Sequence, residues 1–352
     1  MAKVTGFIKF TKLFTSKPPF MKHLFELTKE LIIIPSVTGN EAAVADFVGN
    51  HLQTRGFQIR EQNVGQDRKN ILATLHSTAK VILCTHMDTV PPFIAADEDE
   101  HTIYGRGACD AKGILAAMIV AASTLKDMGM TEFGLLFVVG EETDSLGAKT
   151  ANSLAIDSEY IIVGEPTENK LGIGHKGLTT LRLEATGRSA HSAFPALGDS
   201  AIDKLLKVLN SIRRIKFGED AILGKSLVNI GTIEGGVAHN VIPEKATATI
   251  SIRNTVPSTK VIETLRARLN GDIDMHILSR SEPQKLFTLP NYEQVVLPFG
   301  TDIPHLKHFG KPLLIGPGSA KVAHTSEECV SKKQLAEAVE IYINLVQKIL
   351  TI

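Results

Sequence analysis

Val81-Ile82-Leu83-Cys84-Thr85-His86-Met87-Asp88 is the stretch of sequence that decides the fold. Its first four residues form an unbroken apolar run, which is typical of a strand buried on both faces of a sheet. Two more runs of this kind follow at 135–139 and 161–163, and an Ala-rich helical segment at 113–128 lies between the first two runs. Strands that alternate with helices predict an α/β domain with a central, mostly parallel sheet.

A second pattern begins near residue 176. The segment 178–185 alternates apolar and polar residues, which indicates a strand with one solvated face. The elements that we expect after it are a helix at 199–215, strands at 226–234 and 244–253, a helix at 258–270 and a strand at 273–279. This β-α-β-β-α-β order predicts an α+β domain, 176–281, inserted into a first domain made of 21–175 and 282–352.

Residues 1–20 stand apart from both domains. They carry four lysines and no acidic residue. They contain no long apolar segment and no small-residue cleavage site, so they make a poor secretory signal. We expect a flexible N-terminal extension, with the first helix beginning at Met21.

The composition excludes several classes of partner. Lys+Arg and Asp+Glu both total 38 in 352 residues, and this zero net charge argues against a nucleic-acid partner. No stretch approaches the ~20 apolar residues of a membrane span. The three cysteines, Cys84, Cys109 and Cys329, are too few for a disulfide framework and suit a reducing compartment. We therefore expect a cytoplasmic protein with no membrane and no nucleic-acid partner.

Imidazole and carboxylate side chains gather where the predicted strands end. His86 and Asp88 lie two residues apart at the end of the first strand, so their side chains point to the same side. Glu141 and Glu142 follow the second strand, and Glu165 follows the third. Ligands of open α/β sheets bind beyond the carboxyl ends of the strands. We expect these five groups to share one edge of the sheet.

Two further candidates lie in loops. Asp110 comes just before the helical segment at 113–128, and His324 lies in a late loop. His and carboxylate ligands without thiolate are typical of catalytic zinc sites. A phosphate loop and a serine hydrolase are disfavoured, since Gly105 and Gly107 have no Lys-Ser/Thr after them and no Gly-x-Ser-x-Gly occurs. Each pattern is weak alone, but together they favour a metal-dependent hydrolase.

In chain order, these motifs resemble the zinc aminoacylase/carboxypeptidase family, which includes acetylornithine deacetylase, succinyl-diaminopimelate desuccinylase and glutamate carboxypeptidase. The resemblance covers about 21–352. The motifs that carry it are His86-Met-Asp88-Thr-Val-Pro91, Gly105-Arg-Gly-Ala-Cys-Asp110-Ala-Lys-Gly113, Gly140-Glu141-Glu142, Gly164-Glu165-Pro-Thr167, Gly187-Arg-Ser-Ala-His191, Asn240-Val-Ile-Pro243 and Ala323-His324-Thr325. Individually they are unspecific, but in this order they are highly specific.

The resemblance implies a catalytic centre with two zinc ions, for which cobalt could substitute. The five implied ligands are His86, Asp110, Glu142, Glu165 and His324. Of these, Asp110 would bridge the two ions and would be followed by a cis peptide bond. Glu141 is expected to act as the general base, and Asp88 to orient the His86 ring.

The resemblance also implies how substrate is bound. The inserted domain would act as a lid and join two chains into a homodimer, and its His191 would stabilise the oxyanion in the partner's site. Asn240 would bind near the same oxygen, and Arg253 would pair with a substrate carboxylate. Gly316 and Ser319 would belong to a substrate-facing loop.

The implied reaction is hydrolysis of a small N-acyl amino acid, and N-acetylornithine deacetylase of arginine biosynthesis is the first hypothesis. Succinyl-diaminopimelate desuccinylase and N-acetyl-lysine deacetylase are close alternatives. A dipeptidase or carboxypeptidase is a further alternative, as is a metal-binding homologue without catalysis. The chain has no Trp and a short loop between His86 and Asp110, so the acyl group stays open.

Overall fold

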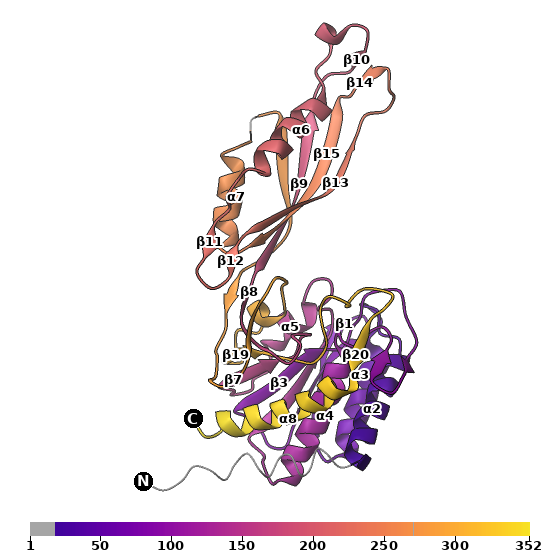
Figure 1. Ribbon diagram of the computed structural model, residues 1–352, viewed down its shortest axis with the longest axis vertical. Helices are drawn as coiled ribbons and strands as arrows, with labels where there is room; N and C mark the ends of the chain where they lie inside the picture. Colours follow the sequence, from indigo (N-terminus) through magenta and orange to yellow (C-terminus); the bar gives the residue numbers. More distant parts are fainter. Residues whose placement is uncertain (1–17, 270) are drawn as a thin grey trace. The chain divides into compact units, whose positions relative to one another are not determined.

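The computed structural model describes residues 18–269 and 271–352, so most of the predicted extension 1–20 lies outside the described residues. The chain divides into two compact units (Figure 1). Unit 1 runs to Ile173 and also contains Leu286–Val295 and Thr301–Ile352, and unit 2 consists of Gly174–Lys285 and Val296–Gly300.

A six-stranded sheet forms the centre of unit 1, in the order β1-β2-β6-β3-β7-β19. Neighbours among β6, β3, β7 and β19 are parallel, and β1 and β2 join antiparallel. The strands are β1 (Gln58–Gly65), β2 (Arg68–Thr74), β3 (Val81–His86), β6 (Phe133–Val138), β7 (Tyr160–Val163) and β19 (Lys311–Leu314). Every residue of β3, β6 and β7 is buried, as their unbroken apolar runs predict.

Helices surround this sheet. They are α2 (Pro18–Ile33), α3 (Ala42–Thr54), α4 (Lys112–Asp127), α5 (Leu146–Ala151) and α8 (Lys332–Ile349). α4 lies beside α2 and α8 and also contacts β3 and β6 (Figure 1). Small side chains let it sit there: its alanines at 116, 117, 121 and 122 are fully buried. The Ala-rich segment is therefore the buried central helix of unit 1.

Short elements complete unit 1 and the segments in which the chain passes from one unit to the other. They are β4 (Asp97–Glu98), β5 (Thr102–Tyr104), β8 (Leu171–His175), β17 (Gln284–Lys285), β18 (Gln294–Leu297), η2 (Ile303–His305) and β20 (Cys329–Ser331). β20, β5 and β4 form one small sheet, and β17, β8 and β18 form another.

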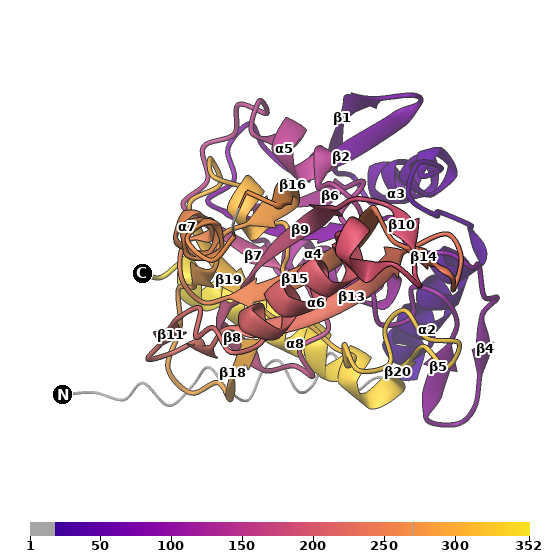
Figure 2. The same cartoon turned by 90° about the horizontal axis from the view of Figure 1, so that it is seen from above.

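Unit 2 is built on a four-stranded antiparallel sheet in the order β13-β15-β9-β16. Its main elements are β9 (Gly177–Thr186), α6 (Ala201–Ile212), β13 (Leu227–Gly235), β15 (Lys245–Asn254), α7 (Ser258–Arg266) and β16 (Ile273–Ser281). The shorter ones are β10 (Ala190–His191), η1 (Pro195–Leu197), β11 (Glu219–Asp220), β12 (Gly224–Lys225) and β14 (Val241–Ile242). Figure 2 shows α6 lying over β13, β15 and β9.

Burial in unit 2 alternates along the strands, because only one sheet face meets the helices. Leu181 and Leu183 of β9 pack in one core with Leu205 and Leu209 of α6, while alternate residues of β9 are half-buried or exposed. The predicted fold class is thus confirmed: an α/β domain with a mostly parallel sheet, plus a β-α-β-β-α-β domain.

The sequence analysis missed one strand of unit 1. β1 was not predicted, because it is a largely polar edge strand with no buried residue; it is joined to β2 through Gln66 and Asp67, both at positive φ. Glu41 occupies the N-cap position of α3. Glu41 caps nothing there, because its carboxylate accepts hydrogen bonds from Arg68 and from the Gly39 amide.

No helix among the described residues is both long and apolar enough to pass through a lipid bilayer.

Gly147 has no room for a side chain, because a Cβ there would lie 2.3 Å from the Val139 carbonyl oxygen. The buried Asn70 side chain joins the same two residues. Its Nδ2 donates to the Gly147 carbonyl at 2.9 Å, and its Oδ1 accepts from the Val139 amide at 3.2 Å. We expect Gly147→Ala to lower the free energy of unfolding by about 1–3 kcal/mol, as overpacking does. Urea unfolding would measure this.

The control is Gly231→Ala, where the nearest atom to an added Cβ is 3.5 Å away. We expect that variant to unfold at nearly the wild-type urea concentration. Equal stability of the two alanine variants would contradict the close packing at Gly147.

Candidate metal centre

Three neighbouring parallel strands deliver the acidic and imidazole groups of unit 1 to one edge. His86 is the last residue of β3, Glu141 and Glu142 follow β6, and Glu165 follows β7. Since β6, β3 and β7 are adjacent and parallel, their carboxyl ends meet on the same side of the sheet. Asp110 arrives from the loop that precedes α4.

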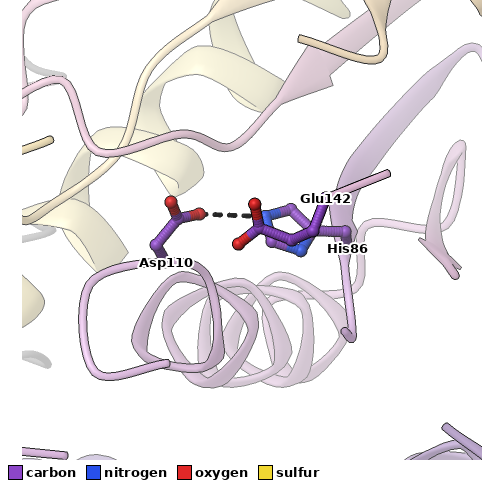
Figure 3. A group of neighbouring side chains, drawn as sticks. All are labelled: His86, Asp110 and Glu142. Atoms are coloured by element: carbon purple, nitrogen blue, oxygen red, sulfur yellow. Dashed lines mark hydrogen bonds and ion pairs between the residues drawn. The ribbon is translucent and has the colours of Figure 1, made fainter. Parts of the chain in front are cut away.

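His86, Asp110 and Glu142 form a compact group in which one donor atom from each side chain lies within 4.8 Å of the others (Figure 3). His86 Nε2 is 3.0 Å from Asp110 Oδ1. The peptide bond between Asp110 and Ala111 is cis, as the resemblance implied. One imidazole and two carboxylates at this spacing make a donor set that suits a divalent cation.

His324 joins this group from a late loop. Its Nε2 lies 3.0 Å from Glu142 Oε1 and 3.4 Å from Asp110 Oδ2. Hydrogen bonds to Asp110 and Glu142 raise the pKa of His324 to about 10, so the two carboxylates favour a positive charge at this ring. The Asp110 carboxylate therefore stands between His86 and His324, one oxygen toward each.

Asp88 organises the turn that carries Glu141 and Glu142. Its buried carboxylate accepts the amide N–H of Glu141 at 3.1 Å and that of Glu142 at 3.2 Å, together with the Thr38 hydroxyl at 2.8 Å. The nearest partner of His86 Nδ1 is the backbone carbonyl oxygen of Asp88 at 3.0 Å, and the carboxylate oxygen Oδ1 of Asp88 is 3.5 Å from the same nitrogen. Asp88 thus faces both the ring and the turn.

Negative charge is crowded at this edge. Burial and the neighbouring Glu165 raise the pKa of Glu141 well above its ordinary value. Burial also raises the pKa of Glu165, and the Asp110 carboxylate adds to the effect. A divalent cation among these groups would favour their ionised forms. The residues present therefore fit a metal site, although only three of the predicted ligands form the tight group described above.

One buried acid here escaped the sequence analysis. Asp302 is almost completely buried, and its Oδ1 has no hydrogen-bond partner among the described residues. Burial raises its pKa to about 7, and its charge interacts with His86 and Asp88. It follows no predicted strand and belongs to no quoted motif, so the sequence carried no signal for it.

Gly316 and Ser319 are hydrogen-bonded to the segment 167–169. The Gly316 amide donates to the Thr167 hydroxyl at 3.0 Å, and its carbonyl accepts from the Asn169 amide at 2.8 Å. The Ser319 hydroxyl donates to Glu168 at 2.8 Å. These bonds tie the loop to the segment after Glu165, and a contact of Gly316 or Ser319 with substrate stays a prediction.

Unit 2 brings His191 and Asn240 together. His191 pairs with Val241 across β10 and β14, and the Ser192 amide donates to the Asn240 carbonyl at 3.0 Å. His191 Nδ1 accepts the Ala193 amide at 3.0 Å, which leaves Nε2 as the protonated nitrogen of the neutral ring. Both residues are exposed.

Arg253 lies at the other end of the unit 2 sheet. β15 starts at Lys245, just after β14, and Arg253 comes eight residues later, about 26 Å along an extended strand. The Arg253 side chain is half-buried, and burial lowers its pKa. Within the described residues, no carboxylate forms an ion pair with it.

Comparison with known proteins gives a consistent result. The model of peptidase family M20/M25/M40 matches residues 82–348. A peptidase M20 domain-containing protein of Schizosaccharomyces pombe is 40% identical over 93% of this chain and 85% of its own length. An Aspergillus niger protein named "Probable carboxypeptidase" is 37% identical over 91% of this chain and 88% of its own.

Solved structures share the fold. A tripeptidase of Staphylococcus aureus superposes with a TM-score of 0.78 at 23% identity, covering 93% of this chain and 99% of its own. A dinuclear metal binding peptidase of Bacillus subtilis superposes with a TM-score of 0.71 at 15% identity, covering 95% of this chain and 99% of its own. The family match spans most of the sequence and contains every predicted metal ligand, so the chain belongs to peptidase family M20/M25/M40 and is a hydrolase of amide bonds.

Proposed function

We propose that the protein is a metal-dependent exopeptidase, a carboxypeptidase or dipeptidase that cleaves the amide bond next to a free carboxyl terminus. The convergence of His86, Asp110, Glu142 and His324 in unit 1 carries this proposal. Relatives at 34% to 40% identity are named "Probable carboxypeptidase" or peptidase M20 domain-containing protein. They favour the peptidase alternative over N-acetylornithine deacetylase, the first hypothesis from the sequence.

His86, Asp110, Glu142, Glu165 and His324 would hold two zinc ions. When bound, such ions supply Lewis acidity that polarises the scissile carbonyl and makes water more acidic.

Glu141 is the proton carrier in this proposal. Its backbone is held by Asp88, and its carboxyl group lies in a buried, acidic environment that raises its pKa. A carboxylate with a raised pKa accepts a proton from the attacking water more readily and can return it to the leaving amine. Asp88 contributes by orienting both the turn and the His86 ring.

Unit 2 supplies the groups that recognise substrate. His191 Nε2 carries the proton that a tetrahedral oxyanion requires, and Asn240 lies beside it. Arg253 is a half-buried guanidinium without an ion-pair partner among the described residues, so it is available for a substrate carboxylate.

The distance between these groups supports a homodimer. A dipeptide spans only about 7 Å, whereas β15 separates Arg253 from the end that carries His191 by about 26 Å. A single chain could bring the Arg253 and His191 side chains to one small substrate only if the sheet of unit 2 changed its structure. A site that uses both residues therefore draws them from two chains. The free, buried thiols of Cys84 and Cys109 are consistent with a reducing, cytoplasmic location.

Glu141→Gln should keep zinc binding and lose turnover by about 10²- to 10⁴-fold, because the amide cannot take the proton. The measurement is kcat on a dipeptide alongside zinc content by elemental analysis. The matched control is Glu132→Gln, an exposed carboxylate of unit 1, which should keep wild-type kcat. Undiminished turnover in Glu141→Gln would rule out Glu141 as the base, and wild-type protein that binds zinc but cleaves nothing would favour the non-catalytic alternative.

Arg253→Gln should lower kcat/KM for a peptide with a free carboxyl terminus by about 10- to 100-fold, since a charged hydrogen bond is lost. The matched substrate is the same peptide with an amidated terminus, which wild type and variant should cleave equally poorly. A panel that adds N-acetylornithine tests the deacetylase alternative. If wild type prefers N-acetylornithine, or cleaves the amide as fast as the acid, the exopeptidase proposal is wrong.

Mixed dimers test the two-chain site. Arg253→Gln and His191→Ala should each keep at most about a tenth of wild-type activity, but chains refolded together should recover about a quarter of it, because half of the dimers carry one intact site. Each variant refolded alone is the control. An inactive mixture that contains heterodimers would show that both residues serve one site from the same chain.

A further inference from the structure

A buried ion pair lies behind the metal centre, and neither of its residues was a predicted site residue. Glu328 is 1% exposed and Arg106 is 2% exposed, and Arg106 Nη1 bonds to Glu328 Oε2. Glu328 comes four residues after His324, and Arg106 comes four residues before Asp110. The pair therefore links two loops that are far apart in sequence and that each carry a predicted ligand.

The second oxygen of Glu328 binds the backbone of the Asp110 loop. Glu328 Oε1 accepts the Gly107 amide at 2.8 Å and the Asp110 amide at 3.3 Å. The Cys109 thiol also lies 3.8 Å from this oxygen. Because Asp110 itself is among the donors, the position of its main chain depends directly on where the Glu328 carboxylate sits.

Arg106 extends the same contacts to a third loop. Its Nε donates to the Pro92 carbonyl at 3.3 Å, and its backbone amide donates to the Ile94 carbonyl at 3.1 Å. The Glu328 carbonyl in turn accepts the Gly105 amide at 3.0 Å. Both charges are thus satisfied by several directional bonds, which is the condition under which a buried pair holds one geometry.

The geometry of Asp110 explains why this matters. Its two carboxylate oxygens face His86 at 3.0 Å and His324 at 3.4 Å. A small rotation of its backbone would break one of these contacts. An ion pair that only stabilised the fold would not need to bond to the main chain of a predicted ligand. Glu328 bonds to the Asp110 amide, and it belongs to the same loop as His324.

We propose that Glu328 is a positioning residue of the metal centre, which fixes the Asp110 carboxylate between His86 and His324 through Arg106 and the amides of Gly107 and Asp110. This inference rests on the proposed metal site. Removing the groups that orient a metal ligand typically costs 10- to 100-fold in metal affinity. Glu328 therefore acts on metal affinity beyond its effect on the stability of unit 1.

The test is zinc affinity of the chelator-treated protein, measured by competition with a chromophoric chelator, together with melting temperature and near-UV circular dichroism. Glu328→Gln removes the charge, and Glu328→Asp keeps the charge but is too short to bond to Arg106 and both amides. Both variants should bind zinc about 10- to 100-fold more weakly while retaining a native near-UV spectrum. If Glu328→Gln does not fold because Arg106 is left unpaired, Glu328→Asp decides the question.

The matched controls are the same two substitutions at Glu282, a unit 2 carboxylate that accepts the Ser258 amide at 2.9 Å. They should leave zinc affinity unchanged. The inference is overturned if a folded Glu328 variant binds zinc like wild type, or if a Glu282 variant with an equal loss in melting temperature weakens zinc binding equally. If wild-type protein binds no zinc, both the proposed metal site and the role of Glu328 are wrong. If wild type binds zinc and the Glu328 variants bind it equally well, only the role of Glu328 is wrong.

Discussion

Carboxylates crowded at the carboxyl edge of a buried parallel sheet impose the main physical constraint on unit 1. Glu141, Glu142 and Glu165 reach this edge from adjacent strands, and burial raises the pKa of all three. Among the described residues, the His86 and His324 rings lie against the carboxylates of Asp110 and Glu142. Such an arrangement is costly without a cation, so the fold and the proposed metal chemistry depend on each other.

Arg–Glu ion pairs pack against the turns that carry these groups. Arg68 and Glu41 form a bidentate pair beneath Gly140, where a Cβ would lie 2.7 Å from the Arg68 guanidinium. Arg106 and Glu328 occupy the corresponding place beneath the Asp110 loop. The first pair packs against Gly140, the residue before Glu141, and the second bonds to the backbone amides of Gly107 and Asp110. This support gives the loops the rigidity that a catalytic site requires.

The two units divide the proposed work. Unit 1 concentrates metal ligands and the proton carrier, while unit 2 presents His191 and Asn240 at one end of its sheet and Arg253 at the other. Membership in the M20/M25/M40 family accounts for the hydrolase chemistry. In the proposed function, unit 2 and the loop between His86 and Asp110 would decide between a peptide and an N-acyl amino acid.

Sequence alone determined the order of elements and the identity of most site candidates. Apolar runs such as 81–84 predict buried strands because both faces must be covered, and polar residues directly after parallel strands must share an edge. The tertiary structure decided what depends on long-range contact. It brought Glu328 to the Asp110 amide across 218 residues, buried Asp302 where its charge interacts with His86, and placed His191 on β10 and Arg253 near the far end of β15. Local periodicity carries no information about such pairings, because they arise only when distant segments pack.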